Sequence, residues 1–157
     1  MKRAYKFIVG CAAILGIVIS KKYICSGIDK QNIIRRKKFE SFYNLAERWI
    51  TIHEEGKSLE SILEERNIKT IAVYGLGKLG KHVVTQLKGS RVSVAYVIDR
   101  AFKGYWQDVE VKPLQGHIPD VDAIIVTAIN DMDAIEKELK KYTDCTVLSL
   151  EELLYEG

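Results

Sequence analysis

The sequence predicts an α/β protein with a Rossmann-like, mostly parallel sheet and flanking helices, preceded by an N-terminal apolar helix and a helical adaptor. Two observations carry this prediction. From residue 68 to residue 157, short apolar runs alternate with helix-like segments, which is typical of a parallel sheet with right-handed crossovers. The first apolar run, residues 71–74, also leads directly into a glycine-rich turn with G-x-G-x-x-G spacing.

The glycine-rich turn has the residue types that a phosphate-binding loop needs. Gly75 permits a tight turn out of the strand, Gly77 leaves room for a phosphate beside the backbone, and Gly80 lets the next helix pack closely. That helix is predicted to end near Lys88. The free N–H groups and the dipole at its start attract negative charge. We therefore expect the whole turn to contact a nucleotide: Gly75, Leu76, Gly77, Lys78, Leu79 and Gly80.

Two further segments are predicted to reach the same edge of the sheet. A second apolar run, residues 92–98, ends at Asp99, about 24 residues after Gly75, which suits a carboxylate that accepts hydrogen bonds from a ribose. A third run, residues 121–127, is too apolar to face water on either side. Ligands of such sheets bind beyond the carboxyl ends of the strands. The residues expected to complete the site are Asp99, Arg100, Thr127, Ala128 and Asn130. The alternative is a scaffold whose glycines serve only the turn.

The remaining elements of this domain are shorter. Residues 101–107 predict a loop, and residues 109–111 alternate as a short edge strand does. A helix is expected to begin at about Asp131. Residues 145–150 then predict another strand, and residues 151–155 predict a final short helix.

Residues 1–26 form the N-terminal apolar segment, in which residues 7–19 are uncharged and flanked by lysines. As a helix this run would be about 20 Å long, shorter than the ~30 Å hydrocarbon core. It predicts a marginal membrane anchor, with a cleaved signal peptide and a buried or interfacial helix as alternatives. The larger basic cluster on its C-terminal side would then place the domain on the cytoplasmic side of the cell membrane.

Charge and cysteine content exclude several classes of function. The net charge is +3, but residues 1–40 carry ten Lys and Arg against two acidic residues. The basic character therefore belongs to the N-terminal segment, and no nucleic-acid partner is expected. The three cysteines form no C-x-x-C pair, which argues against a disulfide framework and against a zinc site. No metal is expected.

A basic linker and helical adaptor are predicted over residues 27–67. One helix ends at Gly56, Ser58 caps a second helix, and Asn67 suits a left-handed stop before the first strand. The first helix has an apolar face that is expected to pack on the sheet, with a partner-binding groove or a dimer seam as alternatives. That face consists of Phe39, Phe42, Tyr43, Ala46, Trp49, Ile50 and His53.

The segments IAVYGLGKLGKHVV, VAYVIDR, VDAIIVTAI and VLSLEELL, within residues 68–155, resemble a known family. The family is the small Rossmann-type, CoA-binding-like modules of bacterial surface-polysaccharide biosynthesis. Such modules precede the acyltransferase domain of some sugar acetyltransferases or sit behind membrane helices in nucleotide-sugar dehydratases. The resemblance implies a bound nucleotide or nucleotide-sugar, with phosphate at Gly75, Gly77 and Gly80 and with ribose or base at Asp99. Catalysis in those relatives belongs to an attached domain, which these 157 residues do not include.

The sequence carries no clear catalytic set. Three histidines, His53, His82 and His117, have no spacing that assembles a nucleophile, base and acid. We expect a membrane-tethered accessory protein that binds NAD or a nucleotide-sugar. Its protein partner is expected to be either a second copy of the chain, in a homodimer, or a polysaccharide-biosynthesis enzyme. The alternatives are a small NAD-dependent oxidoreductase that completes its site by dimerisation and a non-catalytic interaction module with a vestigial pocket. Asp99 also predicts NAD over NADP, because its charge repels a 2′-phosphate.

Overall fold

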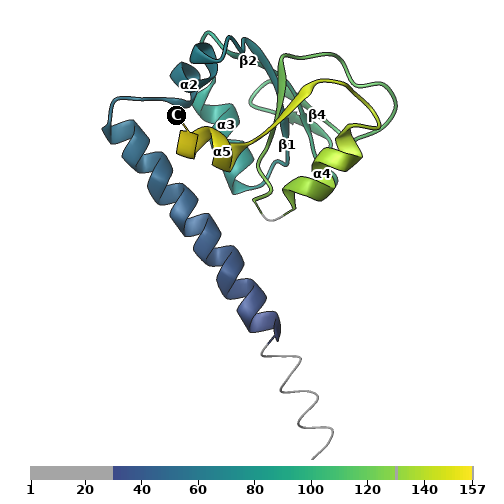
Figure 1. Cartoon of the computed structure of the whole chain (residues 1–157). Coiled ribbons are helices and arrows are strands. Elements are labelled where there is room, and N and C mark those ends of the chain that lie inside the picture. Colours follow the sequence, from purple (N-terminus) through teal and green to yellow (C-terminus); the bar gives the residue numbers. More distant parts are fainter. Residues whose placement is uncertain (1–29, 130, 157) are drawn as a thin grey trace, which may run out of the picture. The chain divides into compact units, whose positions relative to one another are not determined.

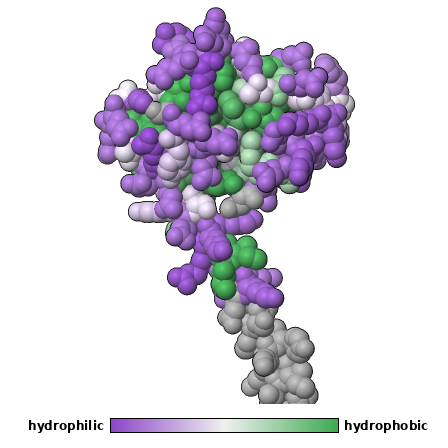
Figure 2. All heavy atoms as spheres, viewed as in Figure 1, coloured by the Kyte–Doolittle hydropathy of each residue, from purple (hydrophilic) through white to green (hydrophobic). Residues whose placement is uncertain are grey.

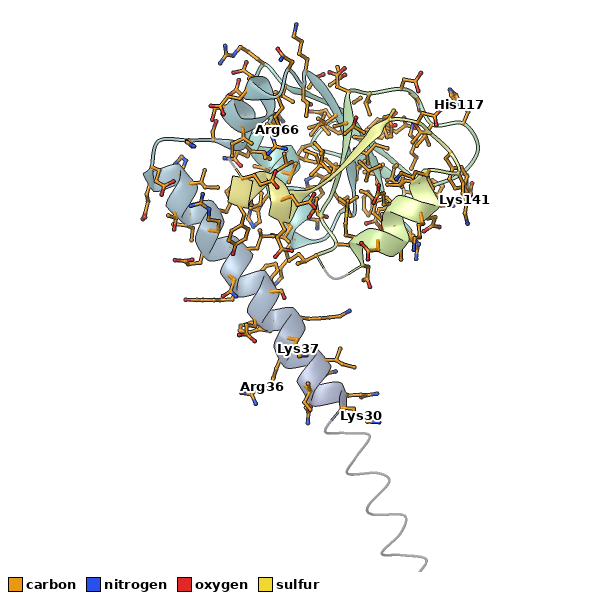
Figure 3. All side chains as sticks on the ribbon, viewed as in Figure 1. Lys30, Arg36, Lys37, Arg66, His117 and Lys141 are labelled. Carbon is orange, nitrogen blue, oxygen red and sulfur yellow. The ribbon has the colours of Figure 1, made fainter. Side chains whose placement is uncertain are left out.

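The computed structural model describes residues 30–129 and 131–156 (Figure 1). The predicted N-terminal apolar helix and Asn130 lie outside the described residues. The chain divides into two compact units, one ending at Ser41 and the other spanning Phe42–Gly157. In the first unit, residues 30–41 are helical, and basic side chains such as Arg36 and Lys37 project from this helix (Figure 3).

The second unit contains a six-stranded sheet of the predicted class. The strands are β1 (Thr70–Tyr74), β2 (Ser93–Ile98), β3 (Gly104–Trp106), β4 (Val109–Lys112), β5 (Ala123–Val126) and β6 (Thr146–Ser149). Their order is β3-β4-β2-β1-β5-β6. Every neighbouring pair is parallel except β3 with β4. The chain leaves β1 toward β2 and later returns to β5 on the other side of β1, so the topological switch point lies between β1 and β5.

The helices lie on both faces of this sheet. They are α2 (Leu59–Glu65), α3 (Lys78–Gln86), α4 (Met132–Leu139) and α5 (Leu150–Glu156). Along β1 the side chains alternate between two cores, as a strand requires. Ile71 and Val73 join the core under α2, α3 and α5, whereas Ala72 and Tyr74 join the core under α4. Hydrophilic residues cover most of the outer surface in the view of Figure 2.

The adaptor has the predicted local structure, but it buries a different part of its helix. Residues 42–54 are helical, Gly56 has φ +79°, and Ser58 caps α2 through a reciprocal pair of hydrogen bonds with Ser61. The helix is anchored in the core by Leu45 and Ile52, which are 0% and 1% exposed. Neither belongs to the predicted apolar face, of which only Phe42 and Trp49 pack on this core.

The prediction was wrong for the segment that follows β2. Residues 104–106 form strand β3, so β4 is an internal strand and β3 is the edge. Gln107 and Asp108 have φ of 48° and 72°, and this left-handed pair closes a tight hairpin between β3 and β4. Three residues with a glycine among them are too short a run for alternation to mark a strand.

Candidate functional site

The glycine turn is held in place by contacts from the end of β2 and from Thr127, which follows β5. Gly75 has φ +96°, and its N–H donates to the carbonyl oxygen of Ile98 at 2.8 Å. The hydroxyl of Thr127, which is 8% exposed, lies 3.0 Å from the carbonyl oxygen of Gly75 and donates to it. A Cβ atom on Gly80 would lie only 1.9 Å from that same oxygen. Gly75, Gly80 and Thr127 are therefore explained by the geometry of the turn itself.

Gly77 differs from the other two glycines of the motif. Its φ is −68°, which any residue can adopt, and a Cβ atom placed there would meet nothing within 4 Å. It is the N-cap residue of α3, no side chain caps the helix, and no acidic residue occupies the first turn. Gly77 and Lys78 are both exposed. This helix start consequently presents open space and positive dipole charge together, which suits a phosphate.

Asp99 lies at the end of β2 and connects two loops. One carboxylate oxygen accepts a hydrogen bond from Leu76 N–H at 2.6 Å, and the other accepts from Ala101 and Phe102 N–H at 2.8 and 3.0 Å. Partial burial acts to raise the pKa of Asp99, but the three N–H donors outweigh burial and leave the pKa below its usual value. The carboxylate is therefore ionised and already holds the glycine turn against the end of β2.

An open cleft of about 480 Å³ lies beyond the carboxyl ends of β1, β2 and β5. The predicted residues that line it are Gly75, Asp99, Arg100 and Ala128. Small and apolar residues also line it, including Ile98, Ala134 and Ile135. The charged residues Asp131 and Glu138 line it as well. Of the glycine turn only Gly75 lines this cleft, so the cleft joins the start of the turn to the segments that follow β2 and β5. Leu76 and Leu79 are buried at 6% exposure, so only their backbone can face a ligand.

Among the residues of this cleft that sequence reasoning missed, Tyr74 and Glu138 carry the groups of most chemical interest. Tyr74 is 6% exposed, and its hydroxyl lies near Arg100 but makes no hydrogen bond of good geometry among the described residues. Burial raises its pKa, and the nearby charge of Arg100 acts in the opposite direction. Glu138 on α4 forms an ion pair with Arg100. Tyr74 directly precedes Gly75, and this position in the sequence could have indicated that Tyr74 lines the cleft. Nothing in the sequence spacing indicates that Glu138 meets Arg100.

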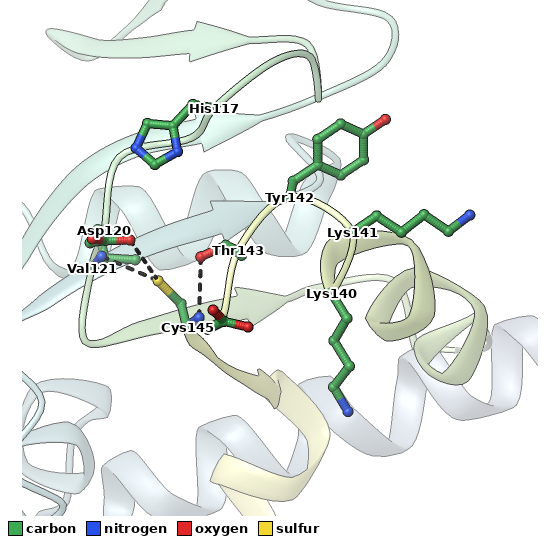
Figure 4. A pocket seen from close by; sticks show the side chains of 9 residues that line it. His117, Asp120, Val121, Lys140, Lys141, Tyr142, Thr143 and Cys145 are labelled. Atoms are coloured by element: carbon green, nitrogen blue, oxygen red, sulfur yellow. Dashed lines mark hydrogen bonds between the residues drawn. The ribbon is translucent and has the colours of Figure 1, made fainter.

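A second depression, of about 660 Å³, lies where the chain enters β5 and β6, at the opposite edge of the sheet (Figure 4). His117, Asp120 and Cys145 line it, and the Cys145 Sγ accepts a hydrogen bond from Val121 N–H at 3.5 Å. Within residues 30–129 and 131–156, no group of three or more His, Cys, Asp or Glu side chains could hold a metal ion. The residues of this depression therefore give less support for a binding or catalytic site than the residues of the cleft at the glycine turn.

Comparison with protein-family models, with curated proteins and with solved structures gave no match. In the part of the chain that the structure describes, no helix has the length and apolar character needed to cross a bilayer.

Proposed function

We propose that this chain binds a nucleotide, either NAD or a nucleotide-sugar, with the phosphates at Gly77 and the nucleoside in the cleft lined by Tyr74, Asp99 and Arg100. The observation that carries the proposal is the open space at Gly77. Turn geometry accounts for the other two glycines of the motif, whereas the backbone at Gly77 would accept any side chain. A side chain there would occupy the space in front of the α3 start, where a phosphate binds most favourably.

The direct test is a titration of the purified chain with NAD, a UDP-sugar and ATP, followed by calorimetry. Native mass spectrometry of the freshly purified protein provides a second readout, because a co-purified nucleotide adds its own mass. Binding of at least one of these ligands at micromolar concentration supports the proposal. Failure of all three to bind, with no added mass in the spectrum, would contradict it.

We further propose that residues 1–26 hold this nucleotide-binding domain at the cytoplasmic face of the cell membrane, where it acts as an accessory factor in surface-polysaccharide metabolism. The uncharged run of residues 7–19 with its flanking lysines supports the tether, and the family resemblance of residues 68–155 supports the metabolic role. Burial of such a run contributes several kcal/mol at ~25 cal/mol per Å² and is not screened by salt. The full chain should therefore remain with membranes after a high-salt wash, and removal of residues 1–26 should release it. Recovery of the full chain in the soluble fraction would contradict the tether.

A further inference from the structure

The helix of residues 42–54 carries two apolar sectors, and only one of them is covered by the domain. The covered sector holds Leu45 and Ile52. The second sector, which we call the seam, consists of Tyr43, Ala46, Ile50 and His53. Tyr43 and Ile50 are each 61% exposed. Large apolar side chains exposed side by side on one helix face are unusual on the surface of a soluble domain.

A groove of about 690 Å³ lies beside the seam, and its walls come from this helix and from α3. Trp49 forms part of the wall, and its indole N–H donates to the Gln86 side-chain oxygen at 2.9 Å. The Trp49 ring also meets the His82 ring edge-on, with 6.3 Å between centroids. Because these contacts fix the wall, the groove is formed before any partner arrives.

The spacing of the seam indicates that its partner is another helix. The seam residues Tyr43, Ala46, Ile50 and His53 follow one another in steps of three, four and three residues. Alternating steps of three and four are the repeat by which two helices pack along each other. A two-fold axis that brings this face against the same face of a second copy would cover the exposed Tyr43 and Ile50 side chains of both chains together.

We propose that the seam binds the same seam of a second copy of this chain, with the two helices parallel and each seam residue facing its counterpart. Charge determines the direction. In the heptad register of the seam, glutamates occupy both positions of one flank within residues 42–54: Glu47 and Glu54. An antiparallel pair would set these glutamates against each other, whereas a parallel pair sets them against the other flank. That flank carries Phe42 and Trp49. The proposal does not depend on nucleotide binding.

Disulfide trapping in the full chain tests both the contact and its direction. The natural cysteines are first replaced by serine, and single cysteines are then introduced at Ile50 or at Asn44. Ile50 lies in the seam, whereas Asn44 is exposed on the same helix but off the seam. Under mild oxidation we expect Ile50→Cys to form at least tenfold more covalent dimer than Asn44→Cys. Equal yields from the two variants would overturn the proposal.

A mixture of Tyr43→Cys and His53→Cys chains distinguishes the two directions, because an antiparallel pairing of the seam places Tyr43 opposite His53. Preferential cross-linking between the unlike chains, with none between like chains, would show an antiparallel pair and overturn the parallel arrangement. As an independent readout, Ile50→Glu should convert the dimer into a monomer in sedimentation, and Asn44→Glu should leave it dimeric. At 100 μM the protein concentration is well above the Kd of a micromolar dimer. A wild-type chain that sediments as a monomer at this concentration would also overturn the proposal.

Discussion

The carboxylate of Asp99 accepts a hydrogen bond from the backbone N–H of Leu76 at 2.6 Å, and this bond joins the end of β2 to the glycine turn. The second carboxylate oxygen holds Ala101 and Phe102. A carboxylate has about four acceptor sites, so roughly one remains for a ribose hydroxyl. Asp99 therefore organises the cleft before any ligand binds, a role that adds to the predicted contact with ribose.

Replacement of Asp99 by Asn should destabilise the protein and flatten its acid response. The pKa of Asp99 is lower in the folded chain than its usual value. Its contribution to stability is consequently present above about pH 4, the unfolded value, and is lost as the pH falls through the folded value. We expect Asp99→Asn to cost about 1–2 kcal/mol at pH 7 and to lose less stability than wild type below pH 4. Urea unfolding across pH measures both effects. Parallel wild-type and variant curves would contradict this role.

Gly80→Ala should damage the fold, whereas Gly77→Ala should not. The new Cβ atom at position 80 would lie 1.9 Å from the Gly75 carbonyl oxygen, so α3 would have to move away from β1. Overpacking of this kind costs about 1–3 kcal/mol or more. At position 77 the Cβ atom meets nothing, so the change in stability should stay within about 1 kcal/mol, the range of ordinary N-cap effects. Thermal unfolding of the two variants side by side is the measurement, and equal melting temperatures would be inconsistent with the packing described.

Tyr74→Phe should increase stability and weaken ligand binding. The Tyr74 hydroxyl is buried and makes no hydrogen bond of good geometry among the described residues. An unpaired buried polar group costs about 1–3 kcal/mol, and its removal recovers part of that cost. If a ligand supplies the missing partner, the variant should bind it about tenfold more weakly, since one neutral hydrogen bond is lost. Chemical denaturation and calorimetry give the two readouts. A less stable variant with unchanged affinity would show that the hydroxyl serves the fold alone.

Much of the sheet domain could be predicted because its signals are local. The turn residues Gly75 and Gly80 have their expected roles, and the Asp99 and Ala128 segments meet at one sheet edge. The pairing of Arg100 with Glu138 could not be predicted, because it depends on where α4 crosses the sheet. Strand β3 was missed because three residues carry too little periodicity.

The adaptor shows a different limit of sequence reasoning. The large aromatic residues correctly predict that the helix has an apolar face. The size of a side chain does not, however, determine which part of that face is buried. Leu45 and Ile52 reach the core, while Tyr43 and Ile50 remain exposed. A helix with two adjacent apolar sectors has a broad hydrophobic stripe, and only the tertiary contacts show which sector the domain covers.

Glu138→Gln should change the choice between NAD and NADP. Arg100 is paired with Glu138 and lies beside the negative Asp99, so it is poorly placed to receive a 2′-phosphate. We expect wild type to bind NAD more tightly than NADP. Loss of the Glu138 charge frees Arg100 and should raise NADP affinity several-fold relative to NAD, because an arginine with no carboxylate partner can pair with the phosphate. Tighter NADP binding by the wild-type chain would show that Arg100 outweighs Asp99.

The proposed nucleotide site places the phosphates at the start of α3. Its most direct test is Gly77→Val, measured by calorimetry with whichever of NAD, a UDP-sugar or ATP the wild type binds. The branched side chain fills the space that is open beside Gly77, and Gly77→Ala provides the smaller matched change. We predict at least a hundredfold loss of affinity for Gly77→Val, a smaller loss for Gly77→Ala, and unchanged circular dichroism for both. Wild-type affinity in Gly77→Val would contradict this placement.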